Sequence, residues 1–340
     1  MSKSEMLRIA ESIREFIDQL SVGKQPFTVQ AYGVALRRFE AFLEQTYHFT
    51  EETNAHDLTV DHAIAFGKSL QGLSPATIKN YLAAISQFYR YLFSQRLVEI
   101  DMADHERLFS TFKQMRPRAS SLPRVPSDEM IDALIQAACA EPEQPKRRQS
   151  PSDKERGYLQ RQRNIALLLA LRSSGMRLGE ALTLRRGDLD YRSKSALVTG
   201  KGRKQRVVYF DPEAWNAIQE YLKARQDGKR TRALSSLPIF ARHDRRAGDR
   251  VLSLTRQRVE QIFAELAERA QVDPKPTPHW FRHWFATQVL DRTQDLAALQ
   301  DMLGHESPVT TRIYAKVSTK RLRQVHDAAF GKEKGGNDNN

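Results

Sequence analysis

The segment SSGMRLGEALTL, residues 173–184, decides the fold of the second half of the chain, because one helix ends in it and another begins. Gly175 suits the left-handed turn that ends a helix, and a new apolar pattern starts directly after it. Arg177 therefore belongs to the first turn of the new helix, where backbone N–H groups without intrahelical partners attract anions. Glu180 is its i, i+3 neighbour and can hold the guanidinium in place, although an ordinary surface ion pair has the same spacing.

The composition favours a protein that binds nucleic acid. A chain of 340 residues is enough for about two domains, and Lys+Arg 54 against Asp+Glu 41 leaves a net charge of +13. This excess indicates a polyanion, either nucleic acid or an acidic membrane surface. The single cysteine, Cys139, excludes a disulfide framework and a cysteine-rich zinc module. Residues 165–171 form the longest apolar run, too short to span a bilayer, and the N-terminus lacks the apolar core of a signal peptide, so we expect a cytoplasmic protein.

The first third of the chain reads as a small helical domain, which we place at residues 1–113. Ser74-Pro75 offers an N-cap and a proline at the first helical position, and weaker helical patterns cover residues 6–20 and 60–70. The clearest amphipathic stripe has apolar residues at alternating spacings of three and four: Val29, Tyr32, Leu36, Phe39 and Leu43.

A basic, proline-rich linker at residues 114–127 separates this domain from a second one at 128–330, and we expect the tail 331–340 to be disordered. The second domain begins with helices over 129–139 and 164–173. Between them, residues 141–163 are polar and basic and are interpreted as a solvated insertion that contacts DNA or simply faces water.

A β-hairpin is the one β-structure that the sequence predicts with a clear signature. Its arms are residues 195–199 and 205–210, with Gly200-Lys201-Gly202 at the tip. The tip carries Lys201, Arg203, Lys204 and Arg206, so it is a cationic finger suited to a DNA groove, and a lysine there can deliver a proton. A charged, solubilising turn is the simpler alternative.

A third segment, residues 277–287, starts a helix at Thr-Pro and places His279 and Arg282 on one face. His279 and His283 have the i, i+4 spacing of zinc ligands, but no Glu follows the first histidine and the only cysteine is distant. A histidine beside an arginine fits a phosphate better than a metal, because the guanidinium presents a fixed fork to phosphate oxygens.

The fourth segment, residues 303–317, contains a tight connection at Gly304-His305 and a short helix with Tyr314 near its middle. A tyrosine in a helix is ordinarily an aromatic core residue. The stretch from Arg312 to Arg323 holds basic residues and no acid, so the surroundings of Tyr314 favour a phenolate near a phosphate.

Taken in order, the four segments resemble those of the tyrosine recombinase (phage integrase) family, over essentially the whole chain and with the layout of its Xer-type members. The first arginine motif of the family matches residues 175–180, and the second histidine precedes the tyrosine by nine residues. The stretch 141–163 is longer than in compact members, and no β arm-binding domain precedes the helical one. The catalytic residues implied by the resemblance are Arg177, Lys201, His279, Arg282, His305 and Tyr314, with Glu180 orienting Arg177 or a histidine.

The resemblance implies a mainly α fold with a small β-hairpin or sheet in the catalytic domain. It also implies a two-domain DNA clamp made of a SAM-like core-binding domain and a catalytic domain. Tyr314 would attack a DNA phosphate to give a 3′-phosphotyrosine, and strands would be exchanged through a Holliday junction. The arginines and His305 would stabilise the transition state, Lys201 would protonate the leaving oxygen, and His279 would take the tyrosine proton. Neither a metal nor ATP nor another cofactor is expected.

The implied partner is double-stranded DNA with a specific core site, bound by a tetramer of this chain or of this chain with a related recombinase on two DNA sites. No membrane partner is expected, and the DNA-bound protein would be nucleoid-associated. The residues predicted to contact DNA are Lys79, Arg203, Lys204, Arg206, Arg312 and Lys316.

Two alternatives share part of the pattern. A type IB topoisomerase uses a similar residue set without a specific site, and the Xer-like layout disfavours it. A DNA-binding regulator with a vestigial site would share the charge and the helices and would not need Tyr314.

Overall fold

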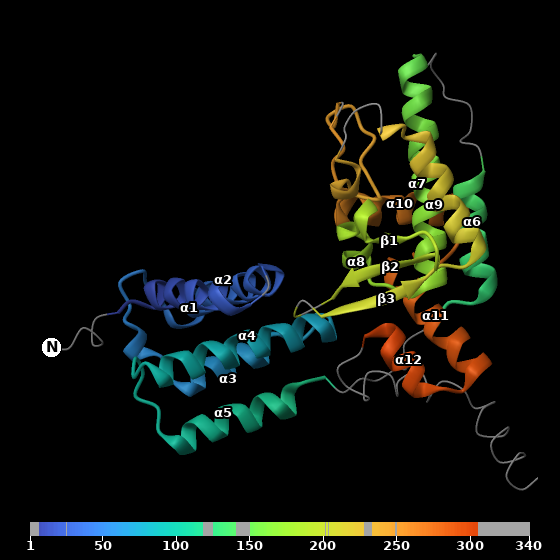
Figure 1. Ribbon diagram of the computed structural model, residues 1–340. Helices are drawn as coiled ribbons and strands as arrows, with labels where there is room; N and C mark the ends of the chain where they lie inside the picture. Colours follow the sequence, from blue (N-terminus) through green and yellow to red (C-terminus); the bar gives the residue numbers. More distant parts are fainter. Residues whose placement is uncertain are drawn as a thin grey trace, which may run out of the picture. The chain divides into compact units, whose positions relative to one another are not determined.

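The computed structural model describes residues 7–24, 26–117, 125–140, 150–200, 202, 204–227, 233–248 and 250–304. These residues form two compact units, Met1–Ser121 and Leu122–Asn340, which are drawn in Figure 1. The described chain is mostly helical, with a three-stranded antiparallel sheet in the second unit. This confirms the predicted mainly α fold with a small sheet.

The first unit is a helical domain. Its helices are α1 (Ile9–Gly23), α2 (Pro26–Tyr47), α3 (Val60–Ser69), α4 (Pro75–Ser94) and α5 (Met102–Met115). Ser74 caps α4 as predicted, because its hydroxyl accepts a hydrogen bond from the Thr77 backbone at 3.2 Å. The predicted stripe of α2 enters the core, where the rings of Phe39 and Phe66 meet edge to face.

The second unit is built around the helix α7 (Pro151–Ser174). Its other elements are α6 (Asp128–Cys139), α8 (Leu178–Thr183), β1 (Leu189–Asp190), β2 (Ser195–Thr199), β3 (Gln205–Tyr209), α9 (Pro212–Ala224), α10 (Arg256–Arg269), α11 (Pro278–Thr293) and α12 (Leu296–Leu303). Figure 1 shows α7 running the length of this unit with α6 and α9 alongside, and α11 and α12 at the end where α7 finishes.

The sheet has the order β1-β2-β3, and the β2–β3 pair confirms the predicted hairpin. Its register pairs Ser195 with Tyr209 and Thr199 with Gln205. Ala196, Val198 and Val208 face the core. β1 was not predicted, because a strand of two residues is too short to show a period of two.

The predicted solvated insertion at 141–163 is wrong over residues 151–163, which form the first turns of α7. Ser150 caps this helix and Pro151 occupies its first position, a strong start signal that the polar composition concealed. Leu159 and Arg163 are both buried, and Nη1 of Arg163 donates to the Ala241 carbonyl at 3.3 Å. Arg163, a basic residue within the apolar pattern, therefore packs against a loop that is distant in sequence. Residues 141–149 lie outside the described part of the chain.

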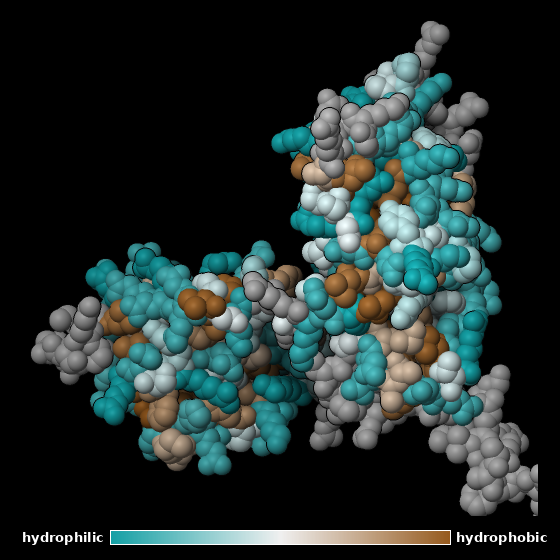
Figure 2. Space-filling view, in the orientation of Figure 1, coloured by the Kyte–Doolittle hydropathy of each residue, from teal (hydrophilic) through white to brown (hydrophobic). Residues whose placement is uncertain are grey.

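Polar side chains cover most of the face drawn in Figure 2, and apolar ones appear there as separate patches. In the described ranges, no helix combines the length and the apolar character needed to cross a bilayer.

Candidate active site

The site begins at the junction of α7 and α8, where Gly175 ends α7 in the left-handed conformation with φ of 61°. A Cβ on this residue would lie 2.3 Å from the ring of Phe285, so only glycine fits the turn. Arg177 follows as the N-cap residue of α8, one position before the first turn in which the sequence placed it. The close contact with Phe285 brings α11 against this junction.

The Glu180 carboxylate binds both the backbone N–H and the guanidinium of Arg177. The Arg177 N–H donates to Oε2 at 2.7 Å and Nη1 donates to Oε1 at 3.0 Å. The Glu180 side chain is 4% exposed and that of Arg177 is 40% exposed. The carboxylate is thus buried while the guanidinium still reaches solvent. This contact differs from an ordinary surface ion pair, in which both side chains are exposed.

The Glu180 carboxylate also binds Arg206 from β3. Nη1 donates to Oε1 at 2.7 Å and Nη2 donates to Oε2 at 2.8 Å, a two-pronged contact. Burial alone raises the pKa of Glu180, but the hydrogen bonds from Arg206 and Arg177 outweigh it and leave that pKa below its usual value. Glu180 is therefore ionised at neutral pH.

Arg206 was predicted to contact DNA, and the structure places its guanidinium inside the fold instead. Besides Glu180, it binds the Met302 carbonyl near the end of α12, to which Nε donates at 2.9 Å. The side chain is only 12% exposed. These contacts favour a structural role over the predicted DNA contact, and the sequence pattern of the hairpin carries no signal for them.

Arg282 joins the ends of two helices. It lies on α11 and is 2% exposed, and its Nη1 and Nη2 donate to the carbonyls of Gly175 at 2.8 Å and Leu303 at 2.6 Å. Both acceptors lie at helix C-termini, where a cation is favoured by the helix dipole. Arg282 therefore fixes the turn before Arg177 against the end of α12.

His279 lies in the first turn of α11 and is exposed, close enough to Arg282 and Arg177 for their charges to act on it. Partial desolvation, followed by the charges of Arg282 and Arg177, lowers its pKa below the ordinary value for histidine. The ring meets that of His283 edge to face with centroids 4.4 Å apart. His279 is consequently neutral at pH 7 and able to accept a proton.

The zinc alternative gains no support in the described part of the chain, where no three His, Cys, Asp or Glu side chains are arranged to hold a metal ion. Burial, followed by the charges of His279 and Arg282, lowers the pKa of His283 to about 4. Two histidines beside two arginines form a region that suits an anion.

Three of the predicted catalytic residues, Lys201, His305 and Tyr314, lie outside the described residues, as do Arg203, Arg312 and Lys316. The sequence neighbours Gly200 and Gly304 belong to the described residues. A Cβ on Gly200 would lie 3.3 Å from Oε1 of Glu180, and one on Gly304 would lie 3.2 Å from Cδ of Arg206. The residue before Lys201 and the residue before His305 thus both border the cluster of Arg177, Glu180 and Arg206. Lys204 is exposed on the hairpin, and Lys79 is exposed on α4 of the first unit.

Comparison with known proteins agrees with this arrangement. The sequence model of the Phage integrase family matches residues 153–321, and that of the Phage integrase N-terminal SAM-like domain matches residues 13–96. Tyrosine recombinase XerC of Pelobacter propionicus is 33% identical over 331 residues, which cover 96% of this chain and 97% of that protein. The chain belongs to the tyrosine recombinase family. Tyrosine recombinase XerD of Mycobacterium tuberculosis is 30% identical over 334 residues, covering 94% of this chain and 97% of that protein.

Solved structures share the fold of this recombinase. XerH bound to its palindromic difH substrate has a TM-score of 0.65 at 20% identity and covers 94% of this chain and 84% of that one. A lambda integrase dimer bound to a core site has a TM-score of 0.62 at 14% identity, covering 91% and 95% of the two chains.

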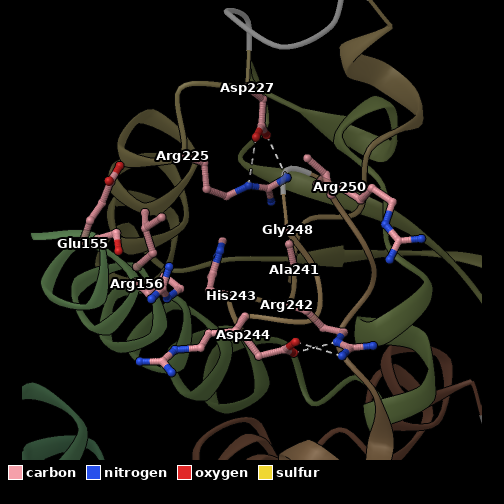
Figure 3. Close-up of a pocket in the computed structure, with 14 residues that line it drawn as sticks. Glu155, Arg156, Arg225, Asp227, Ala241, Arg242, His243, Asp244, Gly248 and Arg250 are labelled. Carbon is pink, nitrogen blue, oxygen red and sulfur yellow. Dashed lines mark hydrogen bonds and ion pairs between the residues drawn. The ribbon is translucent and has the colours of Figure 1, made fainter. Parts of the chain in front are cut away.

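The recombinase also has a cavity of about 260 Å³ beside the first turns of α7, at the other end of this helix from Gly175. Figure 3 shows its lining of charged side chains, in which the Arg225 guanidinium points at Asp227 and that of Arg242 at Asp244. Of the described residues predicted to be catalytic, none lines this cavity. It belongs to the scaffold and not to the cluster around Arg177.

Proposed function

We propose that this tyrosine recombinase cleaves and rejoins DNA at a specific site, with Tyr314 as its nucleophile. The observation that carries the proposal is the convergence of Arg177, Arg282 and His279 at the junction of α7 and α8. Two guanidinium groups and a neutral imidazole at one place provide charge stabilisation and a proton acceptor, as an attack on a phosphodiester requires.

The reaction consists of two balanced transfers. The Tyr314 oxygen attacks the phosphorus, the bond to the 5′-oxygen breaks, and a 3′-phosphotyrosine and a 5′-hydroxyl result. His279 takes the tyrosine proton and Lys201 gives a proton to the leaving 5′-oxygen. Attack by the 5′-hydroxyl of a partner strand reverses these steps and forms a Holliday junction. The phosphotyrosine conserves the energy of the phosphodiester, so ATP is not consumed.

The charge on the phosphate is stabilised by Arg177, Arg282 and His305 in this proposal. The Arg177 guanidinium is partly exposed and fixed by Glu180, so it is oriented before the DNA arrives. Arg282 is buried at the same junction, where its bonds to Gly175 and Leu303 fix the guanidinium, so in this proposal it stabilises the phosphate through its charge beside Arg177. A rigid donor set stabilises a transition state more than a flexible one, because no reorganisation is needed during the reaction.

Double-stranded DNA with a core site is the proposed substrate, and the net charge of +13 suits it. XerH and lambda integrase are both seen bound to DNA sites. We infer a tetramer on two such sites, made of this chain alone or together with a related recombinase, in the cytoplasm and on the nucleoid. Contacts to the DNA backbone are proposed for Lys79 and Lys204, which are exposed, and for Arg203, Arg312 and Lys316.

A suicide substrate tests the proposal. A nicked duplex that carries the core site traps the covalent complex, because the short fragment with the 5′-hydroxyl diffuses away. The wild-type protein is expected to form the adduct, and Tyr314→Phe is expected to bind the duplex with similar affinity and form none. An adduct in the Tyr314→Phe variant would show that another residue is the nucleophile.

A second measurement separates the recombinase from the topoisomerase alternative. A plasmid with two core sites is expected to yield recombinant products, while one without sites remains supercoiled. Relaxation of the site-free plasmid would favour the topoisomerase. Measuring the mass of the protein–DNA complex by light scattering tests the tetramer, for which four chains on two duplexes are expected.

A further inference from the structure

Arg206 lies where three separate parts of the catalytic unit meet. It belongs to β3, and its two Nη atoms bind Glu180 of α8 at 2.7 and 2.8 Å. Its Nε atom binds the Met302 carbonyl of α12 at 2.9 Å. All three guanidinium nitrogens therefore contact protein atoms, and each acceptor is far from Arg206 in sequence.

The space around Arg206 is closely filled. Gly304 ends α12 in the left-handed conformation with φ of 61°, and a Cβ there would come within 3.2 to 3.5 Å of three Arg206 atoms. The Arg206 side chain is thus clamped between Glu180 and the end of α12. A lysine retains the charge but cannot make the two-pronged contact and the Met302 bond together.

The Glu180 carboxylate has a second cationic partner, Arg177, which shares one of its oxygens with Arg206. Its Oε1 atom accepts from Nη1 of Arg206 at 2.7 Å and from Nη1 of Arg177 at 3.0 Å. Arg206 is 12% exposed and Arg177 is 40% exposed, so the buried arginine holds the carboxylate that orients the accessible one. Without Arg206, the buried carboxylate would lose the strongest of the hydrogen bonds that lower its pKa, and a protonated Glu180 would hold the Arg177 guanidinium less firmly because the ion pair is gone.

We propose that Arg206 is a positioning residue of the reaction, which orients Arg177 through Glu180 and anchors the end of α12 to strand β3. This inference rests on the proposed function, because it assigns Arg206 a part in DNA cleavage. Arg206 acts through Glu180 and does not touch the phosphate. The alternative is the predicted role, in which Arg206 contacts the DNA backbone directly.

Single-turnover cleavage of the suicide substrate, measured together with DNA affinity, distinguishes these roles. Arg206→Gln is expected to slow cleavage by about 10- to 100-fold, because a misplacement of about 1 Å in a reacting group can reduce the rate by up to about 100-fold. Its dissociation constant for DNA and its salt dependence should stay within twofold of wild type. A direct phosphate contact would instead weaken binding and reduce the salt slope by about 1, with the cleavage rate of bound DNA unchanged. Either of those results would overturn the proposal.

The pH profile of cleavage provides a readout that a purely structural defect would not change. In Arg206→Gln the pKa of Glu180 is expected to rise, so the loss of activity in acid should begin at a higher pH than in wild type. That shift should disappear in the double variant Arg206→Gln/Glu180→Gln, which has no carboxyl group to titrate. An unshifted profile in the single variant would contradict the coupling through Glu180.

Two further variants serve as controls: Arg206→Lys keeps the charge at this position, and Arg192→Gln removes a charge elsewhere. The lysine variant keeps the charge and should restore part of the cleavage rate, and it replaces Arg206→Gln if thermal unfolding shows that the latter does not fold. Arg192 is exposed beside the same sheet, and its replacement removes one charge with no expected change in cleavage. Failure of the wild-type protein to form any adduct would refute the proposed function. Normal cleavage by both Arg206 variants beside an active wild type would refute this inference alone.

Discussion

The Nη1 atom of Arg282 donates a hydrogen bond to the carbonyl of Gly175 at 2.8 Å, across 107 residues of sequence. The bond fixes the last turn of α7 to α11, directly before Arg177. A second bond from the same guanidinium holds the Leu303 carbonyl at the end of α12. The position of the first arginine is therefore set by the second one, and the two belong to a single rigid unit.

Replacement of Gly175 by alanine is expected to destabilise the catalytic unit. The added Cβ would lie 2.3 Å from the Phe285 ring, at a φ of 61°. We expect a loss of about 2 kcal/mol or more in the free energy of unfolding, since both strain and overpacking contribute. Urea unfolding measures this. Gly157→Ala is the matched control, because that glycine lies within α7 with open space around it and alanine should raise stability by about 0.5–1 kcal/mol. Equal effects of the two substitutions would contradict the tight turn.

Glu180→Gln is expected to reduce the cleavage rate of bound DNA by about 10- to 100-fold, because it removes the negative charge and puts an NH2 donor where Oε2 accepts from the Arg177 N–H and from Nη2 of Arg206. DNA affinity should be nearly unchanged. Single-turnover cleavage with saturating enzyme measures the rate. Glu213→Gln serves as the control, since Glu213 is 60% exposed and contacts Arg172. A weaker affinity with a normal rate would show that Glu180 acts in binding.

His283 is expected to make stability depend on pH. Its pKa of about 4 in the folded protein lies below the usual value near 6.5, so the unfolded chain binds the proton more tightly. The stabilising contribution is complete above about pH 6.5 and is lost progressively as the pH falls toward 4. Urea unfolding between pH 7 and 4 should show this decline in wild type and a shallower one in His283→Gln. The same dependence of unfolding free energy on pH in the two proteins would show that His283 does not cause the decline.

Asp227→Asn is expected to destabilise the fold without affecting the chemistry. Asp227 is 2% exposed and binds Arg186 at 3.0 Å and Arg225 at 2.7 Å, so the substitution leaves two arginines without their counter-charge. A loss of about 3 kcal/mol in the free energy of unfolding is typical for a broken buried pair. Asp244→Asn at the same cavity should cost under about 1 kcal/mol, because Asp244 is 44% exposed. Slower cleavage by folded Asp227→Asn protein would link the cavity to the active site.

Local patterns predicted much of the secondary structure. The stripe of α2, the Ser74-Pro75 start of α4 and the hairpin of β2 and β3 follow from the spacing of apolar residues and from turn chemistry. The start of α7 was missed because its first turns are polar. The buried partner of Arg163, the Ala241 carbonyl, lies 78 residues away in sequence, beyond the reach of any local pattern.

The sequence by itself determined the order of the motifs, the place where α7 ends and the pairing of Arg177 with Glu180, since all of these depend on neighbours within one or two helical turns. Only the tertiary structure decided what Arg206 and Arg282 contact. The sequence pattern around a basic residue in a hairpin, or around an arginine in a helix, is the same whether the side chain faces DNA or a buried carbonyl. Packing of β3, α11 and α12 around one carboxylate and two helix ends brought these groups together, and it places the Arg206 guanidinium, predicted to contact DNA, on Glu180 and the Met302 carbonyl.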